Sequence, residues 1–469
     1  MWVGARTCVA LCTKRSGARV SGAFPTVHRL GLGCTRLVAP TFIDPISRRW
    51  AVVTSAGVVR LGLGFVASLM IARALGPADF GTFAVLAASV GLVGGLAEGG
   101  LTEAAVLRIS AIWPDKPAEA QQRARAFLWL RLGLAAVVVA VGCLAAGPIA
   151  QRVLNTDAGL LRWALLGIVA TAASGAMSAM LQATGAFGRM SSLTLFNTGL
   201  TALLAVGLGW LTRLDLLAAL VVLGIGTSLA TFLLGRWMLP WGWSLNRLRP
   251  AELRSEARHL LRTGRWLWLA SAFAMLTANA EVLLLNRWAA LPLVGAYALA
   301  LNLASKADLV NTSLYTVLLP GVATLGERGK VGSYLRRGVV RGGMIGLGLI
   351  LLIPLSEPLI VWFYGVDFVT AVPFFRLLLG VMVFDVLLTP FLLLPLAYRQ
   401  PKVLAAADAL RAITLVLVAL ALIPIYGAVG AIVARLAARV AGAGLVLLAL
   451  WIGRPALQVQ HEEAPGVFQ

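Results

Sequence analysis

Residues 55–95 read SAGVVRLGLGFVASLMIARALGPADFGTFAVLAASVGLVGG, which is two apolar runs joined by Gly76 and Pro77. A helix needs about 20 apolar residues to cross a bilayer, and each run has about that length. Glycine followed by proline interrupts a helix and favours a turn. The stretch therefore predicts two membrane spans joined by a tight turn, over 51–72 and 80–102.

The composition of the whole chain excludes a soluble protein. Of its 469 residues, 59% are hydrophobic and 13% are charged, whereas an average soluble domain carries about 25% charged residues. With a mean hydropathy of +0.88, the chain has too little polar surface to coat a soluble globule. We therefore exclude a soluble enzyme, a secreted disulfide scaffold and a disordered chain, and predict an all-α integral membrane protein.

Apolar stretches of span length recur along the rest of the chain. The loops predicted to lie inside hold 19 Lys and Arg, and those outside hold four. By the positive-inside rule we expect both termini to face the cytoplasm. The net charge of +21 is therefore a sign of topology, and we expect no nucleic-acid partner. The predicted spans number twelve, over 51–72, 80–102, 126–149, 160–182, 190–211, 214–235, 266–286, 294–323, 340–364, 368–396, 402–424 and 428–452.

The chain also divides into two similar halves. Residues 73–84, RALGPADFGTFA, align with residues 287–298, RWAALPLVGAYA, at an offset of 214. Within one residue, the same offset brings the basic turn at 185–189 onto 399–402. Six spans per half keep both halves the same way up, so a pseudo-two-fold axis along the membrane normal relates them, as in several transporters. The predicted parts are an extension at 1–49, a six-helix lobe at 50–235, a linker at 236–265, a six-helix lobe at 266–452 and a cytoplasmic tail at 453–469.

The extension 1–49 differs from the rest of the chain. It carries eight Lys and Arg, one acid and three of the four cysteines, without an apolar run long enough for a signal peptide. We expect a disordered tail or a start codon assigned too far upstream, and an organelle transit peptide is the alternative. No Cys or His spacing suits a metal, so we predict no metal site and no cofactor.

The linker predicts a short helix of its own. Pro250 can begin it and Gly264 can end it. An apolar stripe runs along one face, and Arg254, Arg258 and Arg262 follow another at intervals of four. This pattern favours an interfacial helix under anionic headgroups. A plain cytoplasmic connector is the alternative.

Short motifs form a linked series between residues 50 and 452: IARALGPADFG at 71–81, GGLTEAAVLR at 99–108, QATGAFGR at 182–189, EVLLLNR at 281–287, VGAYA at 294–298 and VLLP at 317–320. In this series the chain resembles the polysaccharide (O-antigen type) flippases of the multidrug/oligosaccharidyl-lipid/polysaccharide exporter superfamily. The resemblance implies a single-chain, two-lobed transporter that moves polyprenyl-diphosphate-linked sugars from the inner to the outer leaflet, alongside polysaccharide polymerase or ligase machinery. It also implies a bacterial inner membrane location. Glu281 departs from the family, which usually shows Asp there.

Five basic residues within the predicted spans are candidates for binding this substrate. A charge in a span costs about 2.5–3.5 kcal/mol on insertion scales and is a functional candidate for that reason. Because a diphosphate must exchange water for fixed positive charge, we expect these residues to line a cationic cavity. Internal ion pairs that stabilise packing are the alternative. The candidates are Arg60, Lys306, Arg376, Arg411 and Arg435, with Arg60 and Lys306 favoured.

Other arginines carry a weaker signal. Arg131, Arg162 and Arg265 lie near predicted span ends, where we expect the side chains to reach the interface. Arg439 is ambiguous between the two interpretations.

The span 294–323 carries a polar stripe. Its polar side chains recur at spacings of three and four, which places them on one helix face. Because polar groups facing lipid would be unsatisfied, we expect this face to line a water-filled cavity. Polar packing between helices is the alternative. Besides Lys306, the stripe comprises Asn302, Ser305, Asp308, Asn311, Thr312 and Tyr315.

Three acids within spans are candidates for ion coupling. A buried carboxylate can bind a transported proton or Na⁺, and Asp385, Glu281 and Glu98 are placed to do so. Asp385 is favoured, and the alternative for it is a salt bridge to a nearby arginine such as Arg376 or Arg411. Whether transport is coupled to an ion stays open.

Enzyme motifs are missing from the sequence. It contains no GxxxxGK[ST], GxSxG or HExxH and only three histidines, so we predict a transporter. Its expected partners are a lipid-linked oligosaccharide, membrane lipids and H⁺ or Na⁺. One alternative is a multidrug/cation antiporter of the same superfamily, which calls for more acids than bases in the spans. The other is a membrane glycan polymerase or ligase, which typically works from a large external loop.

Overall fold

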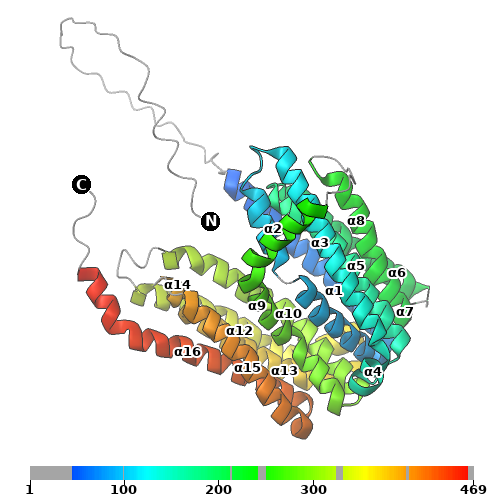
Figure 1. Cartoon of the computed structure of the whole chain (residues 1–469). Coiled ribbons are helices and arrows are strands. Elements are labelled where there is room, and N and C mark those ends of the chain that lie inside the picture. Colours follow the sequence, from blue (N-terminus) through cyan, green and yellow to red (C-terminus); the bar gives the residue numbers. More distant parts are fainter. Residues whose placement is uncertain are drawn as a thin grey trace, which may run out of the picture. The chain divides into compact units, whose positions relative to one another are not determined.

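The computed structural model describes residues 45–98, 100–211, 214–240, 250–323, 331–397 and 401–462, which are almost entirely helical (Figure 1). The chain divides into two units, Met1–Ile46 and Ser47–Gln469, and apart from the first two residues of the first helix all the described helices belong to the second. Most of the predicted extension, residues 1–44, and the end of the tail from 463 lie outside the described residues.

Helix α1, Pro45–Glu98, contains both of the spans predicted from residues 55–95. Gly76 interrupts it with a φ of 68° and a ψ of 175°, a conformation that glycine adopts readily. Pro77 follows at the first turn of the second arm, where its missing N–H costs nothing. The Gly-Pro turn therefore separates two arms, as predicted.

Seven further segments complete the N-terminal lobe. Two aspartates begin helices there: Asp157 Oδ2 accepts the Leu160 N–H at 2.9 Å, and Asp215 Oδ1 accepts the Ala218 N–H at 2.7 Å. The segments are α2 (Leu101–Ser110), α3 (Pro117–Leu144), α4 with η1 (Ala146–Ile149 and Ala150–Leu154), α5 (Ala158–Ala183), α6 (Phe187–Trp210), α7 with η2 (Leu216–Ala218 and Ala219–Gly226) and α8 (Thr227–Met238).

The C-terminal lobe follows the same plan. Helices α3 and α12 begin 214 residues apart, at Pro117 and Val331, and α6 and α15 begin 214 apart, at Phe187 and Pro401. The predicted repeat of two six-helix lobes is confirmed. The C-terminal segments are α9 (Pro250–Trp288), α10 (Leu291–Ala323), α12 (Val331–Tyr364), η3 (Val366–Phe368), α13 (Ala371–Leu392), α14 (Leu394–Ala397), α15 (Pro401–Tyr426) and α16 (Ala428–Glu462).

The two halves meet in a contact that obeys the repeat. A β-carbon on Gly81 would overlap the carbonyl oxygen of Leu291 and lie 3.0 Å from the nitrogen of Gly295. A β-carbon on Gly295 would overlap the carbonyl oxygen of Pro77 and lie 3.0 Å from the nitrogen of Gly81. Gly81 and Gly295 are 214 residues apart, and so are Pro77 and Leu291, so the contact is reciprocal. The second arm of α1 and the start of α10 therefore touch backbone to backbone across the pseudo-two-fold axis.

Nine described helices are long and apolar enough to cross a membrane. Their segments cover ten of the twelve predicted spans, because α1 counts once but contains two arms separated by Gly76. The two remaining predicted spans, 266–286 and 294–323, lie in α9 and α10. The chain is therefore a multi-pass membrane protein.

The prediction that the linker helix ends at Gly264 is wrong. Helix α9 runs unbroken through Gly264 for 39 residues, about 58 Å at 1.5 Å per residue. One glycine inside a helix costs only about 1 kcal/mol, which the helical residues on both sides offset. The linker helix therefore runs directly into the seventh predicted span, 266–286, as one helix.

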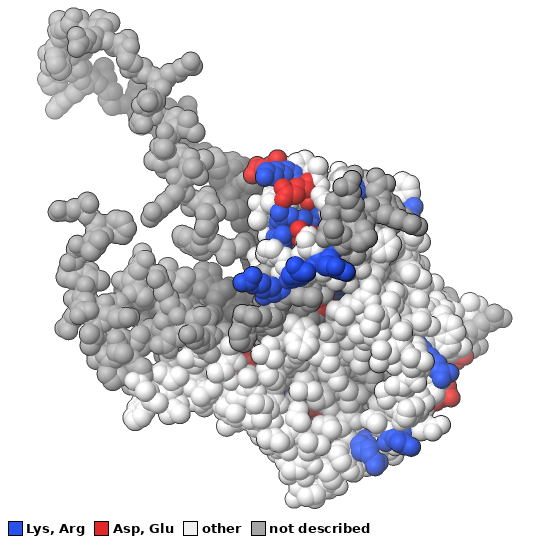
Figure 2. Space-filling view, viewed as in Figure 1, with Lys and Arg blue, Asp and Glu red and all other residues white. Residues whose placement is uncertain are grey.

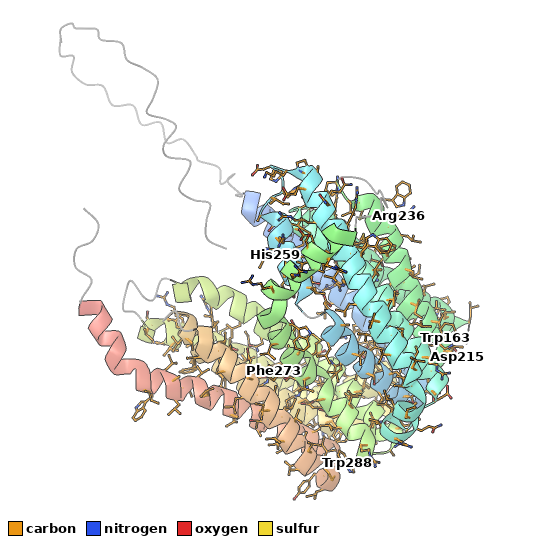
Figure 3. The ribbon with its side chains drawn as sticks, in the orientation of Figure 1. Trp163, Asp215, Arg236, His259, Phe273 and Trp288 are labelled. Atoms are coloured by element: carbon orange, nitrogen blue, oxygen red, sulfur yellow. The ribbon has the colours of Figure 1, made fainter. Side chains whose placement is uncertain are left out.

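The first half of α9 packs on the N-terminal lobe. Leu260 is buried in an apolar cluster with residues of α2, α3 and α5, and Glu256 pairs with Arg108 of α2 at 3.1 Å. The predicted basic face is exposed, at Arg254, Arg258 and Arg262. Figure 2 shows basic and acidic side chains interleaved over this end of the molecule, and His259 of α9 is labelled there in Figure 3.

Candidate functional site

Lys306 lies where the two lobes meet. Its Nζ donates to Asn302 Oδ1 at 2.6 Å, one turn earlier on α10. Ser68 Oγ, from the first arm of α1, donates to the same oxygen at 3.2 Å. Asn302 therefore connects the lobes while it orients Lys306. Among the described residues Lys306 makes no other hydrogen bond, so two of its three ammonium hydrogens remain for a ligand.

Arg60 lies on the first arm of α1, the arm whose Ser68 contacts Asn302 of α10. It is exposed, and within the described part of the chain it forms no ion pair. Gly64 and Ala67 share its helix face, and a β-carbon on Gly64 would lie 3.8 Å from Thr198 of α6. Arg60 lies eight residues before Ser68 on α1, about 12 Å along that helix, and Lys306 lies four residues after Asn302 on α10, about 6 Å along that one.

The remaining stripe residues of α10 do not share one environment. Ser305 is exposed, whereas Asn311 Oδ1 accepts from Thr389 Oγ1 of α13 at 2.7 Å, inside the C-terminal lobe. The side chains of Asp308, Thr312 and Tyr315 lie outside the described part of the structure. The stripe therefore joins α10 to α1 at Asn302 and to α13 at Asn311.

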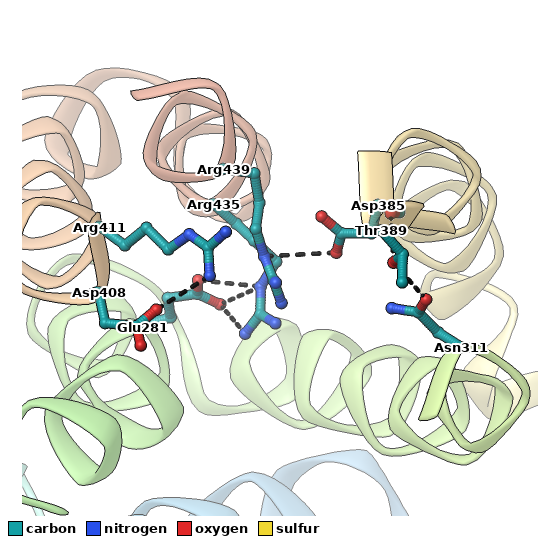
Figure 4. Close-up of polar contacts among 8 residues, drawn as sticks. All are labelled: Glu281, Asn311, Asp385, Thr389, Asp408, Arg411, Arg435 and Arg439. Atoms are coloured by element: carbon teal, nitrogen blue, oxygen red, sulfur yellow. Dashed lines mark hydrogen bonds and ion pairs between the residues drawn. The ribbon is translucent and has the colours of Figure 1, made fainter. Parts of the chain in front are cut away.

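A second group of charges surrounds a cavity of about 840 Å³ between α9, α15 and α16, which we term the C-lobe cavity. Arg435 of α16 binds Glu281 of α9 through Nε and Nη2, at distances of 2.8–3.1 Å. The buried Tyr297 hydroxyl donates to the same carboxylate. Figure 4 shows Arg435 and Glu281 together with side chains of α13 and α15. Phe273 of α9, labelled in Figure 3, lines the apolar part of the cavity.

Two further ion pairs complete this group. Arg439 Nε lies 3.3 Å from Asp385 Oδ2, and Arg411 Nη1 lies 3.0 Å from Asp408 Oδ1 (Figure 4). The alternative interpretation of Asp385, a salt bridge, is observed, but its partner is Arg439. The sequence leaves Arg439 ambiguous, although its spacing of four from Arg435 places both on one face of α16.

Arg376 lies outside the C-lobe cavity. Its Nη2 pairs with Glu357 at 3.1 Å and its Nε donates to Ser356 Oγ at 2.8 Å, both on α12. Arg376 thus ties α13 to α12, and of the five predicted cations only Arg411 and Arg435 line this cavity.

The prediction for Arg131 is wrong. Its side chain is buried, and it pairs with Glu98 at 3.0 Å and donates to Thr102 Oγ1 at 2.6 Å. The reason is that α3 begins at Pro117, nine residues before the predicted span, so Arg131 lies well inside the helix. Arg162 is exposed near the start of α5, and the side chain of Arg265 lies outside the described part of the structure.

Glu98 and Arg131 line a smaller N-lobe cavity of about 380 Å³, which Met275 of α9 also lines.

We expect Glu98→Gln to lower the free energy of unfolding by about 1–3 kcal/mol, because a buried guanidinium loses its charged partner. Arg131→Met should lower the free energy of unfolding by less than Glu98→Gln does, because the side chain of Glu98 that loses its partner is partly exposed to solvent. Thermal unfolding of both variants in nanodiscs tests this order, and the reverse order would contradict it.

One end of the lobe interface is sealed by further contacts. Arg73 Nη2 donates to the carbonyl of Trp362 at 3.0 Å, and Asn286 Nδ2 donates to that of Leu154 at 2.6 Å. Aromatic rings add to the seal, with centroids 5.3–6.3 Å apart, between Phe65 and both Phe363 and Tyr364, and between Phe80 and Phe368. Arg73 and Asn286 lie within three residues of the turns that follow residues 75 and 288, and Gly81 and Gly295 follow these turns.

Comparison with known proteins supports this arrangement. Residues 46–325 match the family described as polysaccharide biosynthesis protein. A search of curated protein sequences finds no significant match. The chain is similar to "Lipid II flippase MurJ, inward closed conformation", with a TM-score of 0.68 and 12% identity, over 89% of this chain and 94% of that one.

Two further structures have the same fold. One is an inward-facing multidrug resistance MATE family transporter of the MOP superfamily, with a TM-score of 0.64 and 15% identity, over 87% of this chain and 99% of that one. The other is a MOP superfamily transporter from Pyrococcus furiosus Vc1 described as having a binding pocket of reverse polarity. It has a TM-score of 0.54 and 15% identity, over 88% and 95% of the two chains.

Proposed function

Because the chain belongs to the polysaccharide biosynthesis protein family, we propose that it is a flippase for polyprenyl-diphosphate-linked oligosaccharide. It moves this substrate from the cytoplasmic to the outer leaflet of a bacterial inner membrane, with both termini in the cytoplasm. The proposal extends what the family and the transporter fold support to a particular substrate and direction.

The observation that carries the proposal is the placement of Arg60 and Lys306 on facing helices of the two lobes. Lys306 is held there through Asn302 by a contact that crosses the interface. A diphosphate that leaves water needs several charged donors, and guanidinium and ammonium groups supply them. A site made by both lobes is also accessible from alternate sides when the lobes rock.

The closed end of the lobe interface indicates which step of the proposed transport cycle this conformation represents. In the proposed orientation, the turns that carry the Gly81–Gly295 contact lie outside the membrane. The lobes would therefore be closed on the outside, and substrate would reach Arg60 from the cytoplasmic side. The polyprenyl tail stays in the bilayer while the charged head group crosses between the lobes.

Ion coupling belongs to the same proposal. Each candidate acid has an arginine partner: Glu281 has Arg435, Asp385 has Arg439, and Glu98 has Arg131. A coupling proton or Na⁺ would therefore have to exchange with a guanidinium at one of them.

The proposal predicts the phenotype of two variants. Arg60→Ala and Lys306→Ala should each lower export at least tenfold, because one charged contact to the diphosphate contributes on the order of 1.5–3 kcal/mol. Cells that rely on either variant should accumulate lipid-linked oligosaccharide that a membrane-impermeant, sugar-modifying reagent cannot reach from outside.

Arg162→Ala is the matched control, because Arg162 is an exposed arginine on α5, away from α10. Normal export by both test variants at normal protein levels would contradict the cationic site. Accumulation of oligosaccharide units that the reagent does modify would instead favour the polymerase or ligase alternative.

The fold of the MATE family transporters also suits the alternative function, a multidrug/cation antiporter. An antiporter of this kind calls for more acids than bases. The C-lobe cavity has the opposite balance, because three guanidinium groups and two carboxylates line it. Efflux assays with organic cations would distinguish the two. We propose that the flippase works as a single chain, with polysaccharide polymerase or ligase machinery as its partner.

A further inference from the structure

The repeat shows that the charges around the C-lobe cavity are not a requirement of the fold. Six charged side chains gather there, from α9, α13, α15 and α16. Subtracting the offset of 214 leads to six positions in the N-terminal lobe, and none carries a charge. The charged set is Glu281, Asp385, Asp408, Arg411, Arg435 and Arg439, and the corresponding residues are Ala67, Thr171, Thr194, Asn197, Val221 and Ile225.

In two of the three ion pairs the arginine lies toward the cavity and the acid behind it. The side chain of Glu281 is 1% exposed and that of its partner Arg435 is 22% exposed. Asp385 is 9% exposed and does not line the cavity, whereas its partner Arg439 is 33% exposed and does. A ligand in the cavity therefore meets guanidinium N–H groups before it meets these carboxylates.

Several of these N–H groups remain available. Arg439 uses Nε in its ion pair, so within the described residues both of its terminal nitrogens are unused. Arg435 binds Glu281 through Nε and Nη2, which leaves Nη1. Arg411 pairs with Asp408 through Nη1 and buries its Nε against Gly442, so among the described residues its Nη2 is the nitrogen left for a ligand. Its carboxylate partner Asp408 is exposed and three residues away on the same helix, a pairing that is weak in water.

The cavity also has apolar walls, which include Leu269, Phe273 and Leu404. Its volume falls in the range of about 300–1,000 Å³ that is usual for small-molecule sites. Three guanidinium groups and two carboxylates leave the lining one positive charge in excess. This balance suits a ligand with one negative charge better than a diphosphate, and a guanidinium fork matches a carboxylate in geometry.

We propose that the C-lobe cavity binds a carboxylate-bearing sugar of the transported glycan, through Arg439 and Arg411, with the sugar ring against Phe273. This inference rests on the proposed flippase function and assigns the sugar a site separate from the diphosphate. The diphosphate stays at Arg60 and Lys306 between the lobes. An acidic sugar is then a feature by which the protein selects its substrate.

The test uses the full chain in nanodiscs and three soluble ligands: glucuronate, glucose and inorganic phosphate. Calorimetric titration should show saturable binding of glucuronate, at least tenfold tighter than that of glucose or phosphate. Arg439→Lys keeps a positive charge opposite Asp385 but removes the fork, so it should weaken glucuronate binding at least tenfold. Arg162→Lys, on the exposed face of α5, is the matched control and should bind as the parent protein does.

Three results would overturn the proposal. They are equal binding of glucose and glucuronate, tighter binding of phosphate than of glucuronate, and unchanged glucuronate binding by Arg439→Lys. The leaflet assay with Arg60→Ala and Lys306→Ala tests the flippase function separately. Loss of export in that assay without glucuronate binding would overturn the sugar site alone. Glucuronate binding without any lipid-linked accumulation would instead overturn the flippase function.

Discussion

Glu281→Gln is expected to lower the free energy of unfolding by about 3–5 kcal/mol, the usual cost of removing one partner of a buried ion pair. Glu281 is almost fully buried and accepts from Arg435 through two nitrogens and from the Tyr297 hydroxyl. A neutral amide leaves the guanidinium of Arg435 without a counter-charge. Thermal or denaturant unfolding of the purified protein in nanodiscs measures the loss.

Two other variants make this prediction specific. Glu281→Gln combined with Arg435→Met should recover most of the lost stability, because no unpaired charge remains. Glu357→Gln is the matched control, since its ion pair with Arg376 is 58% exposed at Glu357 and should contribute little. Similar losses for Glu281→Gln and Glu357→Gln would show that the pair Glu281–Arg435 is not shielded from solvent.

The departure of Glu281 from the family pattern fits the same geometry. Glu281→Asp keeps the charge but shortens the side chain by one methylene, so it should lose part of the two-point contact with Arg435. We expect an intermediate loss of stability, between those of the parent protein and Glu281→Gln.

Gly295→Val is expected to abolish export. Any β-carbon at Gly295 overlaps the carbonyl oxygen of Pro77, so the second arm of α1 and the start of α10 must separate. The surrounding seal, which includes the contact between Arg73 and Trp362, would then open. We expect export to fall at least tenfold in the leaflet assay, because the lobes can no longer close at this end.

Gly81→Val should give the same result, because the contact is reciprocal between positions 214 apart. Gly348→Ala is the matched control: it lies in α12 with no heavy atom within 4 Å of its β-carbon position. It should leave export unchanged and can raise stability slightly, since alanine favours a helix over glycine. Normal export by a folded Gly295→Val would show that this close contact is dispensable to the cycle.

Hydropathy alone predicts most of the fold. The turn at Gly76 and Pro77, the spans and the offset of 214 all reappear in the helices. The largest error in the fold concerns Gly264, because a glycine ends a helix only where nothing favours its continuation. In the structure, α9 continues through it, and the residues before it are anchored on the N-terminal lobe by Leu260.

The candidate site is predictable only in part. Arg411, Arg435 and Glu281 lie together around one cavity, whereas Arg376 binds an acid of the neighbouring α12. Hydropathy places Arg131 near the interface because it puts the start of α3 nine residues too late. The sequence analysis does not identify Arg439 as a residue of this cavity. Its spacing of four from Arg435 is the signal that indicates it, but only when the face of α16 that points inward is known.

The sequence by itself determined three properties of this protein: it crosses a membrane repeatedly, its chain turns at identifiable positions, and its two halves repeat. Each of these properties sums over about 20 neighbouring residues, because the transfer of a helix into lipid depends on its own side chains. Only the tertiary structure decided which charges meet. Glu281 and Arg435 are 154 residues apart, and helix packing, rather than the residues near either one, brings them into contact.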